Sequence, residues 1–194
     1  MAREPPLKGA IMPIFDKETI KQLRQQIRTI PDFPIKGIMF RDITPLLNSS
    51  EYLNKVTDMF VQICNHNNWI PDYIVGPEAR GFIFGPMLAA KLGAGFIPVR
   101  KPGKLPSSTI QIEYSLEYGS NILEMHDDAI SPGAKIIIID DLLATGGTVD
   151  ACVKLCQQQG AEVIGNLFVI ELEGLGARGK LLPIPCESLL SYPA

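Results

Sequence analysis

Apolar residues recur near the N-terminus with the spacing of an amphipathic helix. Four isoleucine and leucine positions lie three or four residues apart, so they share one helical face. These positions are Ile20, Leu23, Ile27 and Ile30. Asp16 stands where a helix N-cap is expected, and Pro31 is expected to end the helix. A second amphipathic stretch, from about Ser50 to Asn67, predicts a longer helix.

Strand and helix patterns alternate through the rest of the chain. Strands are predicted at 72–75, 95–100, 135–140 and 162–170, and helices at 82–91 and 148–159. The segment 135–140 holds four consecutive isoleucines, which is typical of a central parallel strand covered on both faces. Residues 110–125 alternate with period two and predict an antiparallel excursion. The pattern as a whole indicates an α/β fold with an open, mostly parallel twisted sheet flanked by helices.

Two segments depart from this alternation. Residues 31–47 are rich in proline yet apolar, which predicts an ordered, irregular segment lying against the core. Residues 101–109 are polar, basic and rich in Pro and Gly, which predicts a mobile loop. The length of 194 residues favours one domain, 1–194, and the leader at 1–15 has no assigned role.

Composition and charge exclude several function classes. The net charge of −3 and the pI near 5.4 give no positive field for nucleic acid. The four cysteines form no C-x-x-C pair and only two histidines are present, so a zinc site is not expected. The chain has no apolar stretch of signal-peptide length and no run near the roughly 20 apolar residues of a membrane span. Unpaired thiols suit a reducing compartment, and we expect a cytoplasmic protein.

The sequence KIIIIDDLLATGGT, at 135–148, carries the clearest chemical signal. A buried strand is followed by a turn without bulky side chains and then by a helix. The residues of this turn are Ala144, Thr145, Gly146, Gly147 and Thr148. Such a turn lets backbone N–H groups approach an anion closely, with the positive end of the helix behind them. It contains neither a Walker loop nor a G-x-G-x-x-G fingerprint, so we interpret it as a different kind of phosphate-binding loop.

Charged residues around this turn narrow the ligand class. Asp140 and Asp141 repel phosphate, so they are expected to face sugar hydroxyls or a divalent cation. Arg80 follows a predicted strand end, where a guanidinium can bind oxyanions bidentately. Three cations, Arg100, Lys101 and Lys104, open the basic loop and favour a lid over an anionic group. Together these groups predict a site for a ribose 5-phosphate with an activated anomeric centre.

Several separate motifs, in order, resemble those of the type I phosphoribosyltransferases, and among them those that use adenine. The motifs are PDFPIKGIMFRDITPLL at 31–47, ARGFIFGP at 79–86, RKPGKLP at 100–106, YSLEYG at 114–119 and DDLLATGGT at 140–148. The resemblance implies purine salvage: transfer of the 5-phosphoribosyl group of 5-phosphoribosyl-1-pyrophosphate (PRPP) to N9 of adenine, giving AMP and pyrophosphate. It also implies Mg²⁺ held mainly by PRPP with no direct protein ligand, a homodimer, a small hood at 31–47 and a flexible catalytic lid at 100–118.

The resemblance also implies roles for single residues. Glu117 is the acid/base carboxylate near the imidazole nitrogens of the purine, and Arg80 lies in a pyrophosphate loop with a cis peptide at Glu78–Ala79. The residues expected at the pyrophosphate and in the lid are Arg80, Arg100, Lys101, Lys104 and Tyr118. The residues expected at adenine are Met39, Phe40, Arg41 and Leu142, with Phe40 stacking on the base and Leu142 beneath it.

Two alternatives remain open at this point. Enzymes that act on the 6-oxopurines hypoxanthine, guanine or xanthine are similar in fold, but they supply a donor such as Lys to the oxo group. A PRPP-sensing regulator of the same fold without catalysis needs a nucleic-acid surface, which the acidic balance argues against. The presence of Arg80, Glu117 and the basic lid favours turnover.

Overall fold

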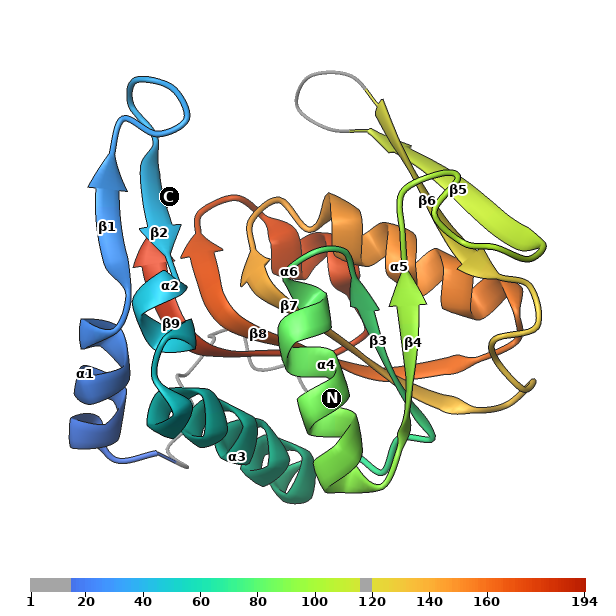
Figure 1. Cartoon of the computed structure of the whole chain (residues 1–194), viewed down its shortest axis with the longest axis horizontal. Coiled ribbons are helices and arrows are strands. Elements are labelled where there is room, and N and C mark those ends of the chain that lie inside the picture. Colours follow the sequence, from blue (N-terminus) through green and yellow to red (C-terminus); the bar gives the residue numbers. More distant parts are fainter. Residues whose placement is uncertain (1–14, 116–119) are drawn as a thin grey trace, which may run out of the picture.

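The computed structural model describes residues 15–115 and 120–194. Its centre is a five-stranded sheet with the order β4-β3-β7-β8-β9, in which every neighbouring pair is parallel (Figure 1). The strands are β3 Tyr73–Pro77, β4 Gly95–Val99, β7 Lys135–Leu143, β8 Glu162–Glu173 and β9 Cys186–Pro193. The predicted open, mostly parallel α/β sheet is therefore confirmed.

Helices cover both faces of this sheet and make three layers (Figure 1). One face carries α1 Lys17–Gln25, α3 Ser50–His66 and α4 Gly81–Leu92, and the other carries α5 Gly147–Gln158 and α6 Ala177–Leu181. The isoleucines of β7 alternate between the two layers, because successive side chains of a strand point to opposite faces. Ile137 and Ile139 join the core of the first layer, and Ile136 and Ile138 join that of the second.

The strand order places a ligand crevice between β3 and β7. From β3 the chain crosses through α4 to β4 on one side, and β7 later pairs with the other side of β3. Ligands of open α/β sheets bind outside the carboxyl ends of the strands at such a reversal of strand order. Arg80 follows β3, and Asp140 and Asp141 lie near the end of β7, so all three flank this point.

The N-terminal segment forms a small hood, which here means residues 28–47. The predicted extent of the first helix was wrong. Asp16 caps α1 as expected, since its Oδ1 accepts a hydrogen bond from the Thr19 N–H at 2.7 Å. The helix nevertheless ends at Gln25 instead of continuing through Ile27 and Ile30. The strand β1 Arg28–Pro31 pairs antiparallel with β2 Met39–Asp42, and α2 Thr44–Leu47 follows. Residues 31–47 are thus more regular than predicted.

A second hairpin confirms the expected antiparallel excursion. It consists of β5 Thr109–Ser115 and β6 Ser120–His126, and Arg100 forms an isolated bridge to Glu124 of β6. Both hairpins project on the side of the sheet to which its strands point (Figure 1). Within 15–115 and 120–194, no helix has both the length and the apolarity that a bilayer crossing requires.

Candidate active site

The small-residue turn between β7 and α5 forms a pocket of about 170 Å³. Its lining consists of Arg80 and the continuous stretch 140–149. Gly146 occupies the N-cap position of α5 in the left-handed conformation, with φ 79°. Among the described residues, no side chain forms a capping hydrogen bond at the start of α5. An added Cβ at Gly146 would lie 3.3 Å from the Ala177 Cβ, so both backbone and space favour glycine here. The backbone N–H groups at the start of α5 are therefore available to an anion.

Arg80 and Asp141 meet across the strand reversal beside this turn. The Arg80 Nε lies 3.0 Å from the Asp141 Oδ2, and the side chains are 43% and 3% exposed, respectively. Burial raises the pKa of Asp141, although the Arg80 guanidinium acts in the opposite direction. Burial, together with the charge of Asp141, raises the pKa of Asp140 well above its usual range. The site thus concentrates two carboxyls and one half-exposed guanidinium at the mouth of the anion pocket.

The basic loop is tied to the residue that precedes the Ala79–Arg80 turn. Glu78 accepts a hydrogen bond from the Arg100 Nε at 2.8 Å, and its other oxygen lies 3.4 Å from the Lys104 Nζ. Burial opposes ionisation of Glu78, but these two cations outweigh it and lower the Glu78 pKa. The peptide bond between Glu78 and Ala79 is cis, as expected. Lys101 is exposed.

A second, apolar cleft of about 400 Å³ lies between the hood and the core. Its lining is Ile30, Phe33, Phe40, Asp42, Ile43, Thr44, Leu47 and Arg80. Phe33 and Phe40 meet edge to face, with ring centroids 5.0 Å apart. Because Arg80 lines both this cleft and the anion pocket, the two spaces adjoin. A flat apolar group in the cleft and a phosphorylated group in the pocket can therefore lie close enough for a covalent bond to join them.

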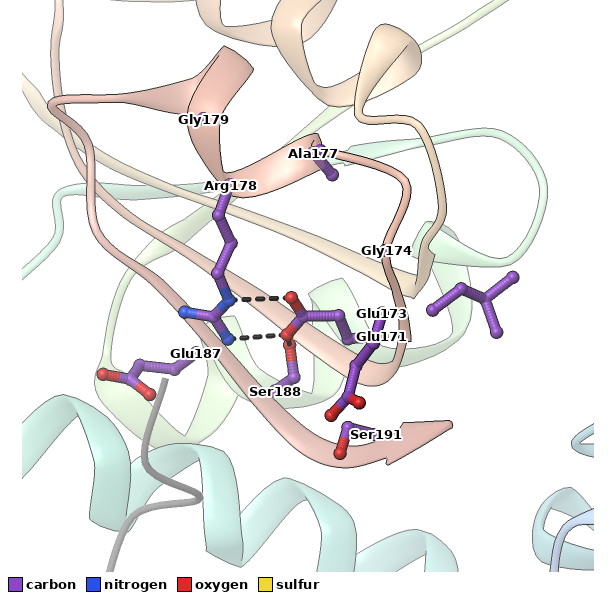
Figure 2. Close-up of a pocket in the computed structure, with 11 residues that line it drawn as sticks. Glu171, Glu173, Gly174, Ala177, Arg178, Gly179, Glu187, Ser188 and Ser191 are labelled. Atoms are coloured by element: carbon purple, nitrogen blue, oxygen red, sulfur yellow. Dashed lines mark hydrogen bonds and ion pairs between the residues drawn. The ribbon is translucent and has the colours of Figure 1, made fainter. Parts of the chain in front are cut away.

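A wider hollow, of about 540 Å³, lies at the ends of β8 and β9, and Glu171, Arg178 and Ser188 in its lining are paired with one another. Figure 2 shows the Arg178 side chain reaching Glu171 through two parallel contacts, of 2.7 and 2.6 Å. Arg178 also donates to the Cys186 carbonyl, and Ser188 donates to Glu171. Hydrogen bonds from Arg178 outweigh burial and lower the pKa of Glu171. This network anchors α6, whose first residue, Ala177, lies next to Gly146 of the anion-binding turn.

Apart from the lid cations Arg100, Lys101 and Lys104, described above, the predicted site residues fall into three groups in the structure. The residues that line the anion pocket are Arg80, Asp140, Asp141, Leu142, Ala144, Thr145, Gly146, Gly147 and Thr148. In the hood, Phe40 lines the apolar cleft, whereas Met39 is exposed and the Arg41 side chain points elsewhere, donating to the Thr29 hydroxyl at 2.6 Å. Glu117 and Tyr118 lie outside the described residues.

Sequence reasoning missed several contributors to the site. Asp42, Ile43 and Thr44 line the cleft beside Phe40, and their place directly after the predicted purine-binding residues was an available signal. For Glu78 the sequence indicates only the cis peptide bond. Its pairing with Arg100 spans 22 residues, a separation that carries no local pattern.

Comparison with known proteins identifies the family of the chain. Residues 43–175 match the model of the phosphoribosyl transferase domain family. The adenine phosphoribosyltransferase of Rippkaea orientalis is 52% identical over 170 residues, which cover 88% of this chain and 99% of the relative. The enzyme of the same name from Clostridium perfringens is 53% identical over 170 residues, covering 88% of this chain and 98% of its own.

Solved structures give the same result. The adenine phosphoribosyltransferase of Thermoanaerobacter pseudethanolicus superposes with a TM-score of 0.86 at 46% identity, covering 89% of this chain and 99% of its own. The Saccharomyces cerevisiae enzyme, solved with adenine and an imino-altritol bisphosphate, gives a TM-score of 0.84 at 40% identity, covering 89% and 99%. The chain therefore belongs to the phosphoribosyltransferase family, and within it to the adenine phosphoribosyltransferases.

Proposed function

We propose that this chain acts in purine salvage, transferring the 5-phosphoribosyl group of PRPP to N9 of adenine and releasing AMP and pyrophosphate. Membership of the adenine phosphoribosyltransferases supports the reaction. The observation that carries the assignment of the site is the position of Arg80, which lines both the anion pocket and the hood cleft. One side chain thus stands where the ribosyl donor and the base have to meet.

In this proposal the turn at 144–148 holds the 5′-phosphate of PRPP. Its amides and the positive end of α5 supply hydrogen bonds and partial charge, and Thr145 and Thr148 add hydroxyl donors. Asp140 and Asp141 accept hydrogen bonds from the ribose diol. Such contacts fix the anomeric carbon beside the hood cleft. The reacting groups are therefore largely oriented before the chemical step begins.

The pyrophosphate leaves from the side of Arg80. Negative charge develops on it as the C1′–O bond breaks, and preorganised cations stabilise that charge. The cations assigned here are Arg80 and, from the lid, Arg100, Lys101 and Lys104. Since Arg100 and Lys104 are paired with Glu78, lid closure exchanges this carboxylate for pyrophosphate oxygens. The closed lid then keeps water from the ribosyl cation.

Mg²⁺ is proposed as the cofactor, held mainly by the oxygens of PRPP. Among residues 15–115 and 120–194, no group of three or more His, Cys, Asp or Glu side chains converges to hold a metal ion. Asp140 and Asp141 line the anion pocket and are assigned to the ribose diol, and no side chain is assigned as a direct ligand of the ion. The ion, when bound, neutralises charge on the leaving pyrophosphate.

Adenine occupies the hood cleft, with Phe40 stacking on the base. Leu142 lines the adjoining anion pocket and is assigned a place beneath the ring by the family resemblance alone. The backbone of Met39–Arg41 reads the amino and ring-nitrogen edge. Glu117 takes up or stabilises the proton displaced when N9 attacks. We further propose a cytoplasmic homodimer; the four buried free cysteines suit a reducing compartment, and the dimer rests on the family resemblance.

The test is incubation of the purified chain with adenine, PRPP and Mg²⁺, with AMP and pyrophosphate measured over time. Hypoxanthine, guanine and xanthine are offered in competition with labelled adenine. We expect stoichiometric AMP and pyrophosphate, with little competition from the 6-oxopurines. Preference for a 6-oxopurine would redirect the base assignment, and PRPP binding without turnover would indicate a regulator.

A further inference from the structure

Tyr192, near the end of β9, contacts two guanidinium groups through its ring. The Arg24 Cζ, from α1, lies 4.6 Å from the ring centroid, and the Arg41 Cζ, from β2, lies 4.3 Å from it. Tyr192 is 9% exposed, so water screens these contacts little. The C-terminal end of the chain lies beside β2 (Figure 1). One ring thus joins the C-terminal edge strand, the first helix and the hood.

The face of the Tyr192 ring, not its hydroxyl, makes this connection. The hydroxyl is buried and has no hydrogen-bond partner among the described residues, and the same holds for the Arg41 Nε. Burial raises the pKa of Tyr192 although the two arginines act against it, so the ring is neutral at physiological pH. An ion pair between phenolate and guanidinium is therefore not the basis of the contact. The remaining attraction is that of a cation for a π face.

Arg41 links Tyr192 to the hood cleft, because it lies on β2 between two residues that line the cleft. Successive side chains of a strand point to opposite faces. In β2, Phe40 and Asp42 line the cleft, while Arg41, between them, rests on Tyr192 and donates to Thr29 of β1. A tilt of β2 that moves Arg41 off the ring therefore also moves Phe40 within the cleft.

Arg24 connects the same ring to the first helix. Its Nη1 donates to the Ser191 carbonyl at 3.1 Å, so α1 is attached to the backbone of β9 next to Tyr192. The clasp formed by Arg24, Tyr192 and Arg41 lies on the side of β2 opposite the cleft and does not line the anion pocket. Its loss should consequently affect the base more than the ribosyl donor.

We propose that Tyr192 is a positioning residue for the purine: its ring, clasped by Arg24 and Arg41, sets the orientation of β2 and hence the fit of the base in the hood cleft. This inference rests on the proposed function for its kinetic consequence. Its structural half, that Tyr192 holds the hood in place, stands independently of the reaction.

The test compares Tyr192→Leu with Tyr192→Phe. Leucine keeps an apolar side chain but removes the π face, and phenylalanine removes only a hydroxyl without a partner. For Tyr192→Leu we expect KM for adenine to rise roughly fivefold, the equivalent of about 1 kcal/mol for one cation–π contact. KM for PRPP should change less than about twofold, and Tyr192→Phe should match the wild type. Tyr52→Leu, which loses a cation–π contact with Lys55 on α3, is the matched control and should leave KM for adenine unchanged.

Hydrogen exchange supplies a readout that needs no turnover. Amides of β1 and β2 should exchange faster in Tyr192→Leu than in the wild type, and at wild-type rates in Tyr192→Phe. Equal rises in both KM values, or unchanged KM and unchanged exchange in Tyr192→Leu, would overturn the inference. A wild type that forms no AMP would refute the proposed function. The exchange rates of β1 and β2 would then still test whether Tyr192 holds the hood in place.

Discussion

Replacing Arg80 with alanine should impair both stability and catalysis, for separable reasons. The substitution leaves the Asp141 carboxyl, which is 3% exposed, without the guanidinium that lies 3.0 Å away. A buried polar group left without its partner costs roughly 1–3 kcal/mol, and a fully buried charge costs more. Arg80 itself is 43% exposed, so water screens the pair and the lower half of that range applies. For a chain of this length we expect a fall in Tm of about 2–8 °C.

The second variant, Arg80→Ala combined with Asp141→Asn, separates the two effects. It removes the charge that Arg80 had compensated, so Tm should return to within about 2 °C of the wild type. Turnover should not return, because the cation that faces the leaving pyrophosphate is still missing and the Asp141 carboxylate assigned to the ribose diol has been replaced as well. We expect kcat/KM to stay reduced by roughly 100-fold or more. Thermal melts followed by circular dichroism and initial rates of AMP formation measure the two quantities.

The outcome that refutes this reasoning is recovery of turnover together with stability in the double variant. Arg80 would then act only as the partner of a buried carboxyl. The matched control is Lys91→Ala, which breaks the exposed ion pair with Asp58 on α3. Surface pairs contribute about 1 kcal/mol or less, so this control should change Tm little and leave the rate unchanged.

Three further substitutions have distinct expected results. Gly146→Ala places a Cβ at φ 79° and 3.3 Å from a neighbouring side chain, so unfolding free energy should fall by about 1–2 kcal/mol in chemical denaturation and KM for PRPP should rise. Asp140→Asn should raise Tm at neutral pH but not below pH 4. The folded-state pKa of Asp140 is raised, so this carboxyl destabilises the fold only at pH values where it is ionised in the unfolded chain. Equal gains in Tm at both pH values would contradict this prediction. Asp42, whose pKa is lowered to about 2 by hydrogen bonds from Thr44 and Arg28, stabilises the hood above pH 4 and loses this effect as pH falls from about 4 to 2. Asp42→Asn should therefore cost about 1–2 kcal/mol at pH 7 and flatten the acid limb of a Tm–pH curve, and an unchanged acid limb would count against the assignment.

Features encoded within a few neighbouring residues could be predicted from the sequence. The four isoleucines of β7 identify a strand buried on both faces, and the small residues that follow identify the turn before α5. Both depend on local spacing and side-chain size, which the chain displays directly. The three-layer α/β arrangement follows from the alternation of such elements.

Features that depend on distant partners could not be predicted. The spacing of Ile27 and Ile30 is compatible with a helix as well as with the observed structure. The strand β1 forms because it pairs with β2, and this pairing leaves no local pattern in the sequence. The strand β9 lies after a cis Leu182–Pro183 bond and Pro185, where sequence signals favour a turn. Contacts such as Arg80 with Asp141, or Tyr192 with Arg24 and Arg41, join segments whose separation in sequence carries no pattern.

The central claim is that the turn at 144–148 binds a phosphate monoester, and the most direct measurement is the dissociation constant of AMP compared with that of adenosine. Both ligands present the same base and sugar, so their ratio isolates the phosphate. Two or more charge-assisted hydrogen bonds, at about 1.5–3 kcal/mol each, predict that AMP binds at least roughly 100-fold more tightly in calorimetric titration. Equal affinities for AMP and adenosine would contradict the account.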